Sequence, residues 1–551
     1  MSNCKSICAV CSRTVYSCYW GKPRESTKSK TKACLWFSIV AVVTVTALAW
    51  MYICMVTYND QEDVNWKGFT ALHLWINWFM VLIILSALIT AYCVFLLIFA
   101  LIQVALKGPL NLHWAHKIFL LVGSIFIASG VIGISLVWKQ EWLTVRLSLE
   151  ATSPFLQFGA VGALTLLCNM VFKAIFTTRQ TLSRYIIGST FATVSVVLFL
   201  LPLCIRSPCF IEKHKLPAKP MLIGHRGAPM LAPENTIMSF NRSISCGIKA
   251  FETDVQLSED RVPFLMHDND SNFLLRTTNA KDAFPHKPLH TSASLTWAEY
   301  QSLNAGEWFV KTDPFKTVSQ LSEAEKEMAQ NQKIPTLQQL LQLAQQHRIH
   351  VMFDLYSPNQ KDDTIDTVKT ILLSGIDRNL VLWLPPTERD YVKASGFTQV
   401  YNNVGEMKRK NGTHLNLKYS KISTREIREL RKNNFDVNLW VVNERWLFSL
   451  LWCAGASSVT TNSCHTLKDM EWPDWTITRQ LYRKIWLTVD IVSLLIMAGL
   501  FVYQWHENQK EVIRVEEEKT VSFLTSKSFD DNTTVSLTSG LISDTSTDKI
   551  S

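Results

Sequence analysis

The sequence predicts an α/β protein: a (β/α)8 TIM-barrel ectodomain inserted between the fifth and sixth spans of a polytopic α-helical membrane protein. Two observations predict it. Apolar runs of about 20 residues or more, each long enough to cross a bilayer, crowd the first two hundred positions, and one more lies near the end. Between the fifth and sixth runs, short apolar strands alternate with helix-like stretches, which indicates βα units and a parallel sheet.

Six apolar runs are the predicted membrane spans, and Trp and Tyr near many of their ends are typical of the membrane interface. One such run could be a buried core helix, but six are hard to explain in that way. A transporter is disfavoured because the runs hold few ionisable residues and show no inverted-repeat pattern. The runs cover Leu35–Val56, Val81–Val104, Ile118–Trp138, Phe155–Phe176, Tyr185–Cys204 and Ile485–Trp505.

Lys and Arg in the flanking segments predict the orientation. The first 33 residues are rich in Lys and Arg and carry the single acid Glu25, whereas the first loop has Asp60, Glu62 and Asp63 against Lys67. Both termini are therefore expected in the cytosol, with the long fifth-to-sixth segment outside the plasma membrane or in an ER or Golgi lumen. The net charge of +9 is largely this topology signal and does not indicate a nucleic-acid partner. Three basic residues oppose the rule: Arg479, Arg483 and Lys484.

Cysteines divide between the two sides of the membrane. Four lie in the N-terminal segment 1–33, where S-acylation or free thiols are the alternatives: Cys4, Cys8, Cys11 and Cys18. Five lie on the outer side or at its boundary, an odd number, so at least one is free or paired elsewhere: Cys204, Cys209, Cys246, Cys453 and Cys464. Because no cleavable signal peptide is evident, the first span of the helical region 34–205 is interpreted as a signal anchor.

The outer segment, residues 213–471, carries about eight strand-like runs, the number that a TIM barrel needs. A Rossmann-like open sheet is the alternative, but no Gly-rich turn follows the first run. Asn235 is the expected cap and Gly247 the expected stop of the first intervening helix. Residues 268–334 are predicted to be an insertion over the barrel mouth, and 506–551 a disordered cytosolic tail after the sixth span, 485–505. The runs are Met221–Gly224, Phe251–Leu257, Val262–Met266, His350–Leu355, Leu380–Leu384, Thr398–Tyr401 or Leu415–Lys418, Val437–Val442 and Ser458–Thr461.

Carboxylates at strand-like positions suggest a metal site. Glu252 and Asp254 are two apart on one strand, so both side chains point to the same face. Side by side they form a hard-oxygen site suited to Ca²⁺ or Mg²⁺. Asp354, at the end of the fourth run, would complete three carboxylates, although a strand-terminal Asp can also cap the following turn.

Histidine and arginine follow other strand-like runs. His225 and Arg226 come directly after the first run, at the rim where barrel active sites form. Arginine there could hold a phosphate with two hydrogen bonds, and histidine suits acid–base work near neutral pH. His267 ends the third run and could reach the same mouth. Any one of them could be structural; their joint placement favours a phosphodiester site.

An ordered set of motifs resembles the glycerophosphodiester phosphodiesterase family, and the arrangement of spans resembles its six-transmembrane branch. The resemblance implies catalytic roles for His225 and His267, phosphate binding by Arg226, and metal binding by Glu252 and Asp254, with His267 also close enough to serve the metal. The motifs are Gly224-His225-Arg226-Gly227, Pro233-Glu234-Asn235-Thr236, Phe251-Glu252-Thr253-Asp254-Val255, His267-Asp268, Ile334-Pro335-Thr336-Leu337 and Trp440-Val441-Val442-Asn443.

The chain also departs from the family pattern. Asp354 and Tyr356 stand where the family has Glu-x-Lys, Gln338 and Gln339 replace acids, and Asn462 replaces an Asp. The resemblance implies metal-dependent hydrolysis of glycerophosphodiesters such as glycerophosphocholine or glycerophosphoinositol, or of lysophospholipid or glycosylphosphatidylinositol headgroups at the bilayer. Because of these departures, a catalytically weak or inactive cell-surface receptor or scaffold is the alternative function.

Glycosylation sequons provide a check on topology. Asn241, Asn269 and Asn411 lie in the predicted outer segment, and Asn532 lies in the predicted cytosolic tail. A glycan on Asn269 would crowd the proposed mouth. Asn411 is therefore the expected acceptor.

Overall fold

The computed structural model describes residues 14–18, 29–72, 74–105, 110–178, 180–268, 270–354 and 360–538, and it divides into two compact units. The first unit comprises the chain up to Thr152 together with Arg206–Thr478, and the second comprises Ser153–Ile205 and the chain from Arg479. Several predictions concern residues outside the described parts, namely those on Cys4, Cys8, Cys11, Asn269 and Tyr356.

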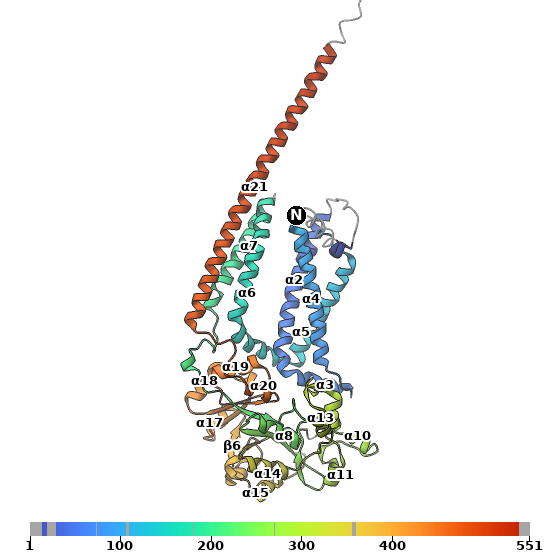
Figure 1. Cartoon of the computed structure of the whole chain (residues 1–551), viewed down its shortest axis with the longest axis vertical. Helices are drawn as coiled ribbons and strands as arrows, with labels where there is room; N and C mark the ends of the chain where they lie inside the picture. Colours follow the sequence, from blue (N-terminus) through green and yellow to red (C-terminus); the bar gives the residue numbers. More distant parts are fainter. Residues whose placement is uncertain are drawn as a thin grey trace, which may run out of the picture. The chain divides into compact units, whose positions relative to one another are not determined.

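The helical part of the first unit is built on three apolar helices that pack side by side (Figure 1): α2 (Ser29–Val56), α4 (Trp78–Ala105) and α5 (Trp114–Val137). The indole of Trp50 on α2 donates a hydrogen bond to the hydroxyl of Ser86 on α4 (2.9 Å), which gives a polar group between the two apolar helices a partner. A short 3₁₀ turn, η1 (Thr57–Asp60), and a helix of mixed polar and apolar residues, α3 (Gln61–Leu72), connect α2 to α4.

The second unit holds the main part of α6 (Glu141–Thr177), together with α7 (Thr181–Leu200) and α21 (Arg479–Thr538). Trp486 on α21 donates to the carbonyl of Phe199 (3.0 Å), and the hydroxyls of Thr165 and Ser493 lie 2.6 Å apart. In the described chain six helices are long and apolar enough to cross a membrane, and they overlap the six predicted spans. The six helices fit a multi-pass membrane protein.

The end of α21 differs from the prediction for the tail. The helix continues through position 505 to Thr538, so the segment predicted to be disordered from 506 is helical to that residue. The residues from 507 to 518 are mostly Glu, Gln, Lys, Arg and Val. Most of these residue types sustain a helix that is already nucleated, even though they cannot bury a core.

Eight parallel strands of the described chain close into a barrel, as predicted, because β1 pairs with both β9 and β2. Both runs that the sequence offered as alternatives are strands. Apolar side chains of the strands and surrounding helices form one core, which the large side chains of Phe251, Phe353 and Trp383 help to fill. The strands are β1 (Met221–His225), β2 (Ala250–Leu257), β4 (His350–Asp354), β5 (Val381–Trp383), β6 (Thr398–Tyr401), β7 (His414–Lys418), β8 (Asp436–Trp440) and β9 (Ser458–Thr461).

One predicted barrel strand lies outside the barrel. β3 (Pro263–Leu265) runs antiparallel to β2, and Val255 is paired with Leu265. Only positions 258–262 connect the two strands, whereas a parallel crossover needs about a dozen residues or more. His267 therefore follows an added hairpin and does not follow a barrel strand.

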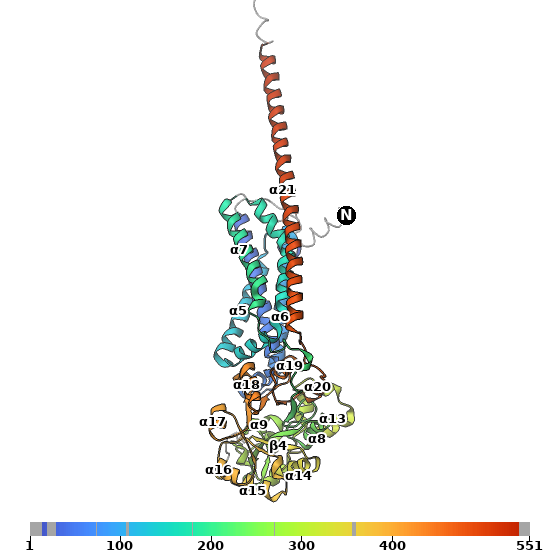
Figure 2. The same cartoon turned by 90° about the vertical axis from the view of Figure 1, so that its left-hand side faces the viewer.

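Helices surround the barrel on the outside (Figure 2). Thr236, and not Asn235 as expected, caps α8: its hydroxyl accepts from the amide of Ser239 (3.3 Å). Gly247 follows the end of α8 with a φ of +74°, consistent with the expected stop. The helices are α8 (Ile237–Ser245), α14 (Leu337–His347), α15 (Asp363–Leu373), α16 (Arg389–Ala394), α17 (Val404–Arg409), α18 (Thr424–Lys432), α19 (Arg445–Ala454) and α20 (Cys464–Lys468).

The segment between β3 and α14 consists of short helices with small apolar clusters of their own. Thr336 and Gln339 at its end form a capping box on α14, in which the Gln339 amide oxygen accepts from the backbone of Thr336 (2.8 Å). Gln339 thus closes a helix end and does not face the barrel mouth. The helices are α9 (Ser271–Thr277), α10 (Ala280–Ala283), α11 (Trp297–Ser302), α12 (Glu307–Thr312) and α13 (Glu323–Gln330).

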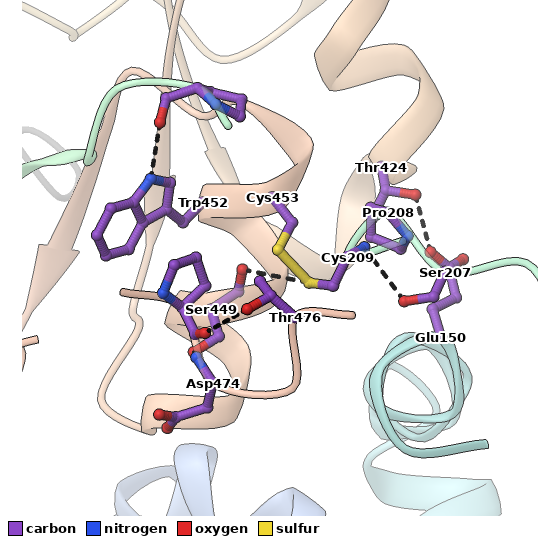
Figure 3. Close-up of a disulfide and its surroundings, with 12 residues drawn as sticks. Glu150, Ser207, Pro208, Cys209, Thr424, Ser449, Trp452, Cys453, Asp474 and Thr476 are labelled. Carbon is purple, nitrogen blue, oxygen red and sulfur yellow. Dashed lines mark hydrogen bonds between the residues drawn. A yellow bond between two sulfur atoms is a disulfide. The ribbon is translucent and has the colours of Figure 1, made fainter. Parts of the chain in front are cut away.

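Two disulfides join four of the five outer cysteines, a pairing that the sequence left open. Cys209 pairs with Cys453 on α19, and Cys246 pairs with Cys464 on α20, while Cys204 is free and exposed. Figure 3 shows the first disulfide, beside which the Thr424 hydroxyl donates to Glu150 (2.8 Å). Both disulfides close loops of more than 200 residues within the first unit.

Candidate active site

A cavity of about 350 Å³ opens at the carboxyl ends of the barrel strands. All six of the residues singled out in the sequence line it. They come from the ends of three barrel strands and from the hairpin, so the fold brings together side chains that are up to 129 positions apart. The six are His225, Arg226, Glu252, Asp254, His267 and Asp354.

His225 ends β1 and is held through its ring nitrogen Nδ1, which lies 2.6 Å from Oδ1 of Asn462. Its Nε2 lies 3.9 Å from a carboxylate oxygen of Glu252. Burial, together with the charge of Arg226, lowers the pKa of His225 to about 3. The imidazole is therefore neutral at physiological pH and has a lone pair available for accepting a proton.

Arg226 follows β1 in a left-handed conformation with a φ of +53°. Its Nη1 donates to Glu234 (2.7 Å), and its Nε lies 3.3 Å from Asp254 but is left without a hydrogen-bond acceptor in the described structure. Burial alone would lower the pKa of Arg226, but the charges of Glu234 and Asp254 raise it, so the guanidinium stays charged. A buried cation with an unsatisfied N–H is suited to a phosphate oxygen.

Gly227 explains why the chain can turn so sharply after Arg226. Its φ is +89°, and a Cβ at this position would come within 2.5 Å of the Ser239 side chain on α8. The Ser239 hydroxyl donates to the carbonyl of Arg226 (3.0 Å) and accepts from the amide of Ala228 (2.8 Å). A residue with a side chain at 227 would push this turn away from α8.

Glu252 and Asp254 lie on β2, and Asp354 is the register partner of Asp254 on the neighbouring strand β4. Burial raises the pKa of Asp354 to about 6, and the charge of Asp254 adds to the effect. Burial and the charge of Asp254 also raise the pKa of Glu252 well above its usual value. Glu252 and Asp354 thus resist ionisation beside Asp254, and a bound cation would stabilise their charged forms.

His267 lies at the cavity after the hairpin, and its Nδ1 bonds the carboxylate of the adjacent Asp268. Burial opposes ionisation of Asp268, but this hydrogen bond and the charge of His267 lower its pKa. The two histidines of the cavity thus have different partners: His267 bonds a carboxylate, and His225 bonds an amide.

Several residues that complete the cavity were not singled out from the sequence. Glu234 pairs with Arg226 and Arg276, and the guanidinium of Arg276 stacks on the Trp66 ring with 3.2 Å to its centroid. Trp66 and Glu62 belong to α3, the segment between the first two predicted spans. Glu62, Asp63 and Lys67 entered the sequence argument only as loop charges, because no local pattern connects this segment with a distant barrel.

A TIM barrel whose rim combines an arginine, two histidines and three carboxylates defines a class of phosphodiester-cleaving enzymes. The model of the glycerophosphoryl diester phosphodiesterase family matches residues 225–518. The chain is 40% identical over 509 residues to the human glycerophosphoinositol inositolphosphodiesterase GDPD2, covering 91% of this chain and 94% of that protein. The chain belongs to the glycerophosphodiester phosphodiesterase family.

A second relative agrees with this assignment. Human glycerophosphodiester phosphodiesterase domain-containing protein 5 is 39% identical over 512 residues, covering 90% of this chain and 84% of that protein. A solved Oleispira antarctica phosphodiesterase in complex with sn-glycerol-3-phosphate aligns with a TM-score of 0.37 at 22% identity, covering 45% of this chain and 95% of that one. The predicted enzyme class, a phosphoric diester hydrolase, is that of the family.

Proposed function

We propose that this chain is a membrane-anchored glycerophosphodiesterase that uses a divalent metal and the two histidines, with its barrel on the outer side of the membrane. The observation that carries the proposal is the joint placement of His225, Arg226, His267 and the three carboxylates around one cavity. Our first substrate candidate is glycerophosphoinositol, the compound after which the human relative GDPD2 is named. Glycerophosphocholine and lipid-linked headgroups are the others.

The charges of the cavity support a metal. Among its described lining residues, six carboxyl groups face two guanidinium groups. A phosphodiester anion would be repelled by that excess unless a cation offset it. Glu252, Asp254 and Asp354 would hold the ion, with His267 close by, and Ca²⁺ and Mg²⁺ suit oxygen ligands of this kind. When bound, the ion would neutralise the phosphate oxygens.

Each of the two histidines would carry out one proton transfer. Arg226 would hold a phosphate oxygen, and the neutral His225 would take a proton from the attacking glycerol 2-hydroxyl or water as its oxygen bonds to phosphorus. His267, whose ring is hydrogen-bonded to Asp268, would give a proton to the departing alcohol as the ester P–O bond breaks. General acid–base help of this type contributes about a hundred- to ten-thousandfold.

Product analysis tests the proposal. The full-length protein in detergent is incubated with glycerophosphoinositol, glycerophosphocholine and a vesicle-borne glycosylphosphatidylinositol reporter, with and without EDTA. Products that appear only without EDTA are expected, and free choline versus phosphocholine tells which ester bond breaks. Binding of these compounds without any turnover would instead support the receptor or scaffold.

Metal affinity is expected to fall in acid. Because the pKa of Asp354 is raised to about 6, its carboxyl is protonated below that pH and must lose the proton to bind a cation. We expect the dissociation constant of Mg²⁺ or Ca²⁺ to rise by about tenfold per pH unit for each displaced proton below pH 6. Calorimetric titration between pH 5 and 7.5 measures it. Asp354→Asn should reduce the slope and the surface variant Asp366→Asn should not; an affinity independent of pH would contradict the site.

Glycosylation tests the outward orientation, which the two disulfides support because thiols stay reduced in the cytosol. Asn411 is exposed in the turn after α17 and is expected to carry a glycan in expressing cells. Thr413→Ala should abolish the glycosidase-sensitive gel shift of that site, whereas Thr413→Ser keeps the sequon and the shift. A glycan on Asn532 with none on Asn411 would reverse the topology.

A further inference from the structure

The segment between the first two predicted spans contacts the side chain that holds His225. Oε1 of Glu62 on α3 accepts a hydrogen bond from Nδ2 of Asn462 (3.1 Å), and Oδ1 of the same amide lies 2.6 Å from Nδ1 of His225. Glu62 and Asn462 are 400 positions apart in the chain. Glu62, Asn462 and His225 thus form one hydrogen-bonded chain of side chains from α3 to the cavity.

This hydrogen-bonded chain fixes which end of the Asn462 amide faces His225. Burial raises the pKa of Glu62 to about 7, and above that pH its ionised carboxylate only accepts hydrogen bonds. It then selects the NH₂ end of the amide and leaves the oxygen for His225. The imidazole must then carry its proton on Nδ1, and the lone pair stays on Nε2, which faces Glu252 across the cavity rim. If the amide were reversed, its NH₂ group would favour the other tautomer, with Nε2 protonated and unable to accept a proton.

The backbone before Glu62 is tied to the barrel. Oδ1 of Asn59 accepts from the amide of Asn443 (2.8 Å), and its Nδ2 donates to the carbonyl of Val441 (2.9 Å). The Tyr419 hydroxyl donates to the carboxylate of Asp60, and the Lys418 ammonium lies 3.5 Å from that group. Glu62 follows these contacts by two residues and is therefore held at a defined position over Asn462.

We propose that Glu62 is a positioning residue: it orients Asn462 so that His225 keeps its unprotonated Nε2 toward the substrate. The proposal rests on the proposed function, in which His225 accepts the proton. It makes the loop between the first two predicted spans part of the catalytic apparatus and explains how a neutral amide can hold a catalytic histidine in one tautomer.

The test compares Glu62→Gln with the double variant Glu62→Gln/Asn462→Asp, using full-length protein in detergent and glycerophosphoinositol as the probe. A glutamine in place of Glu62 keeps the shape but pairs with either end of the amide, so kcat should fall by about ten- to a hundredfold, with KM changed by less than about threefold. An aspartate in place of Asn462 accepts the Nδ1 proton with either oxygen and needs no orienting partner. The double variant should therefore recover most of the lost kcat.

Controls separate the possible outcomes. Lys67→Gln changes an exposed residue of the same helix whose ammonium lies over the Trp138 ring, and it should keep wild-type kcat. Melting midpoints of all variants are measured. Asn462→Ser removes the central amide of the hydrogen-bonded chain and should lower kcat as much as Glu62→Gln does. Full kcat in Glu62→Gln, or no recovery in the double variant, overturns the proposal. If His225→Ala keeps wild-type activity, the proposed function fails and the inference fails with it; a silent His225→Ala beside a fully active Glu62→Gln overturns the inference alone.

Discussion

Replacement of His225 by alanine is expected to lower kcat by about a hundred- to ten-thousandfold while the protein stays folded. The imidazole is the only neutral, buried base that we assign at the rim, and its pKa of about 3 keeps the ring unprotonated at neutral pH, so that a lone pair is free. Its described hydrogen bond is to Asn462, which also bonds Glu62 and the side chain of Asn443. Losing the ring therefore removes the proton acceptor but leaves these neighbours in place.

Initial rates with glycerophosphoinositol and the melting midpoint measure this result together. His214→Ala is the matched control, because that histidine lies on the surface beside Glu212, with its side chain 73% exposed. The control should keep both the rate and the midpoint. A folded His225→Ala protein with the wild-type rate would remove His225 from the mechanism and shift support toward a site that binds without turnover.

The barrel could be predicted because its strands are short apolar runs separated by helical patterns, which is a local signal. The direction of one strand could not be read from the same signal, since an apolar run looks alike in parallel and antiparallel pairs. The length of the connection did carry that information: five positions between Leu257 and Pro263 allow a hairpin and no crossover. Weighing connection lengths would have moved His267 from a barrel strand to the hairpin.

The site could be predicted only in part, because motifs identify residues that lie close together in sequence or at the ends of strands. Glu62 and Trp66 reach the cavity from a loop between two predicted spans, and nothing local distinguishes their charges from ordinary loop charges. Asn462 was noted as a departure from the family pattern, and its partner on α3 gives that departure a physical role. Gln339 was noted in the same way, but it caps a helix, where a glutamine amide oxygen can accept the same hydrogen bond as a carboxylate.

Glu234→Gln is expected to destabilise the first unit by about 3 kcal/mol at pH 7. The Glu234 side chain is 7% exposed and bonds the guanidinium groups of both Arg226 and Arg276. Burial would raise the pKa of Glu234, but the two arginines outweigh it and lower the pKa to about 2. A neutral glutamine would leave two buried cations without their shared counterion, and removing one partner of a buried pair typically costs about 3–5 kcal/mol.

The pH dependence of this destabilisation has a definite sign. Because the pKa of Glu234 is lowered on folding, its stabilisation is complete above about pH 4.5, the range of an unfolded glutamate, and is lost as the pH falls toward 2. Guanidinium unfolding followed by Trp fluorescence should show a wild-type advantage at pH 7 that shrinks below pH 4.5. Glu307→Gln, which removes a surface pair with Lys311, should change stability by no more than about 0.5 kcal/mol. If Glu234→Gln were equally mild, Arg226 would have to be held by Asp254, and the phosphate-binding role of its guanidinium would need a different geometry.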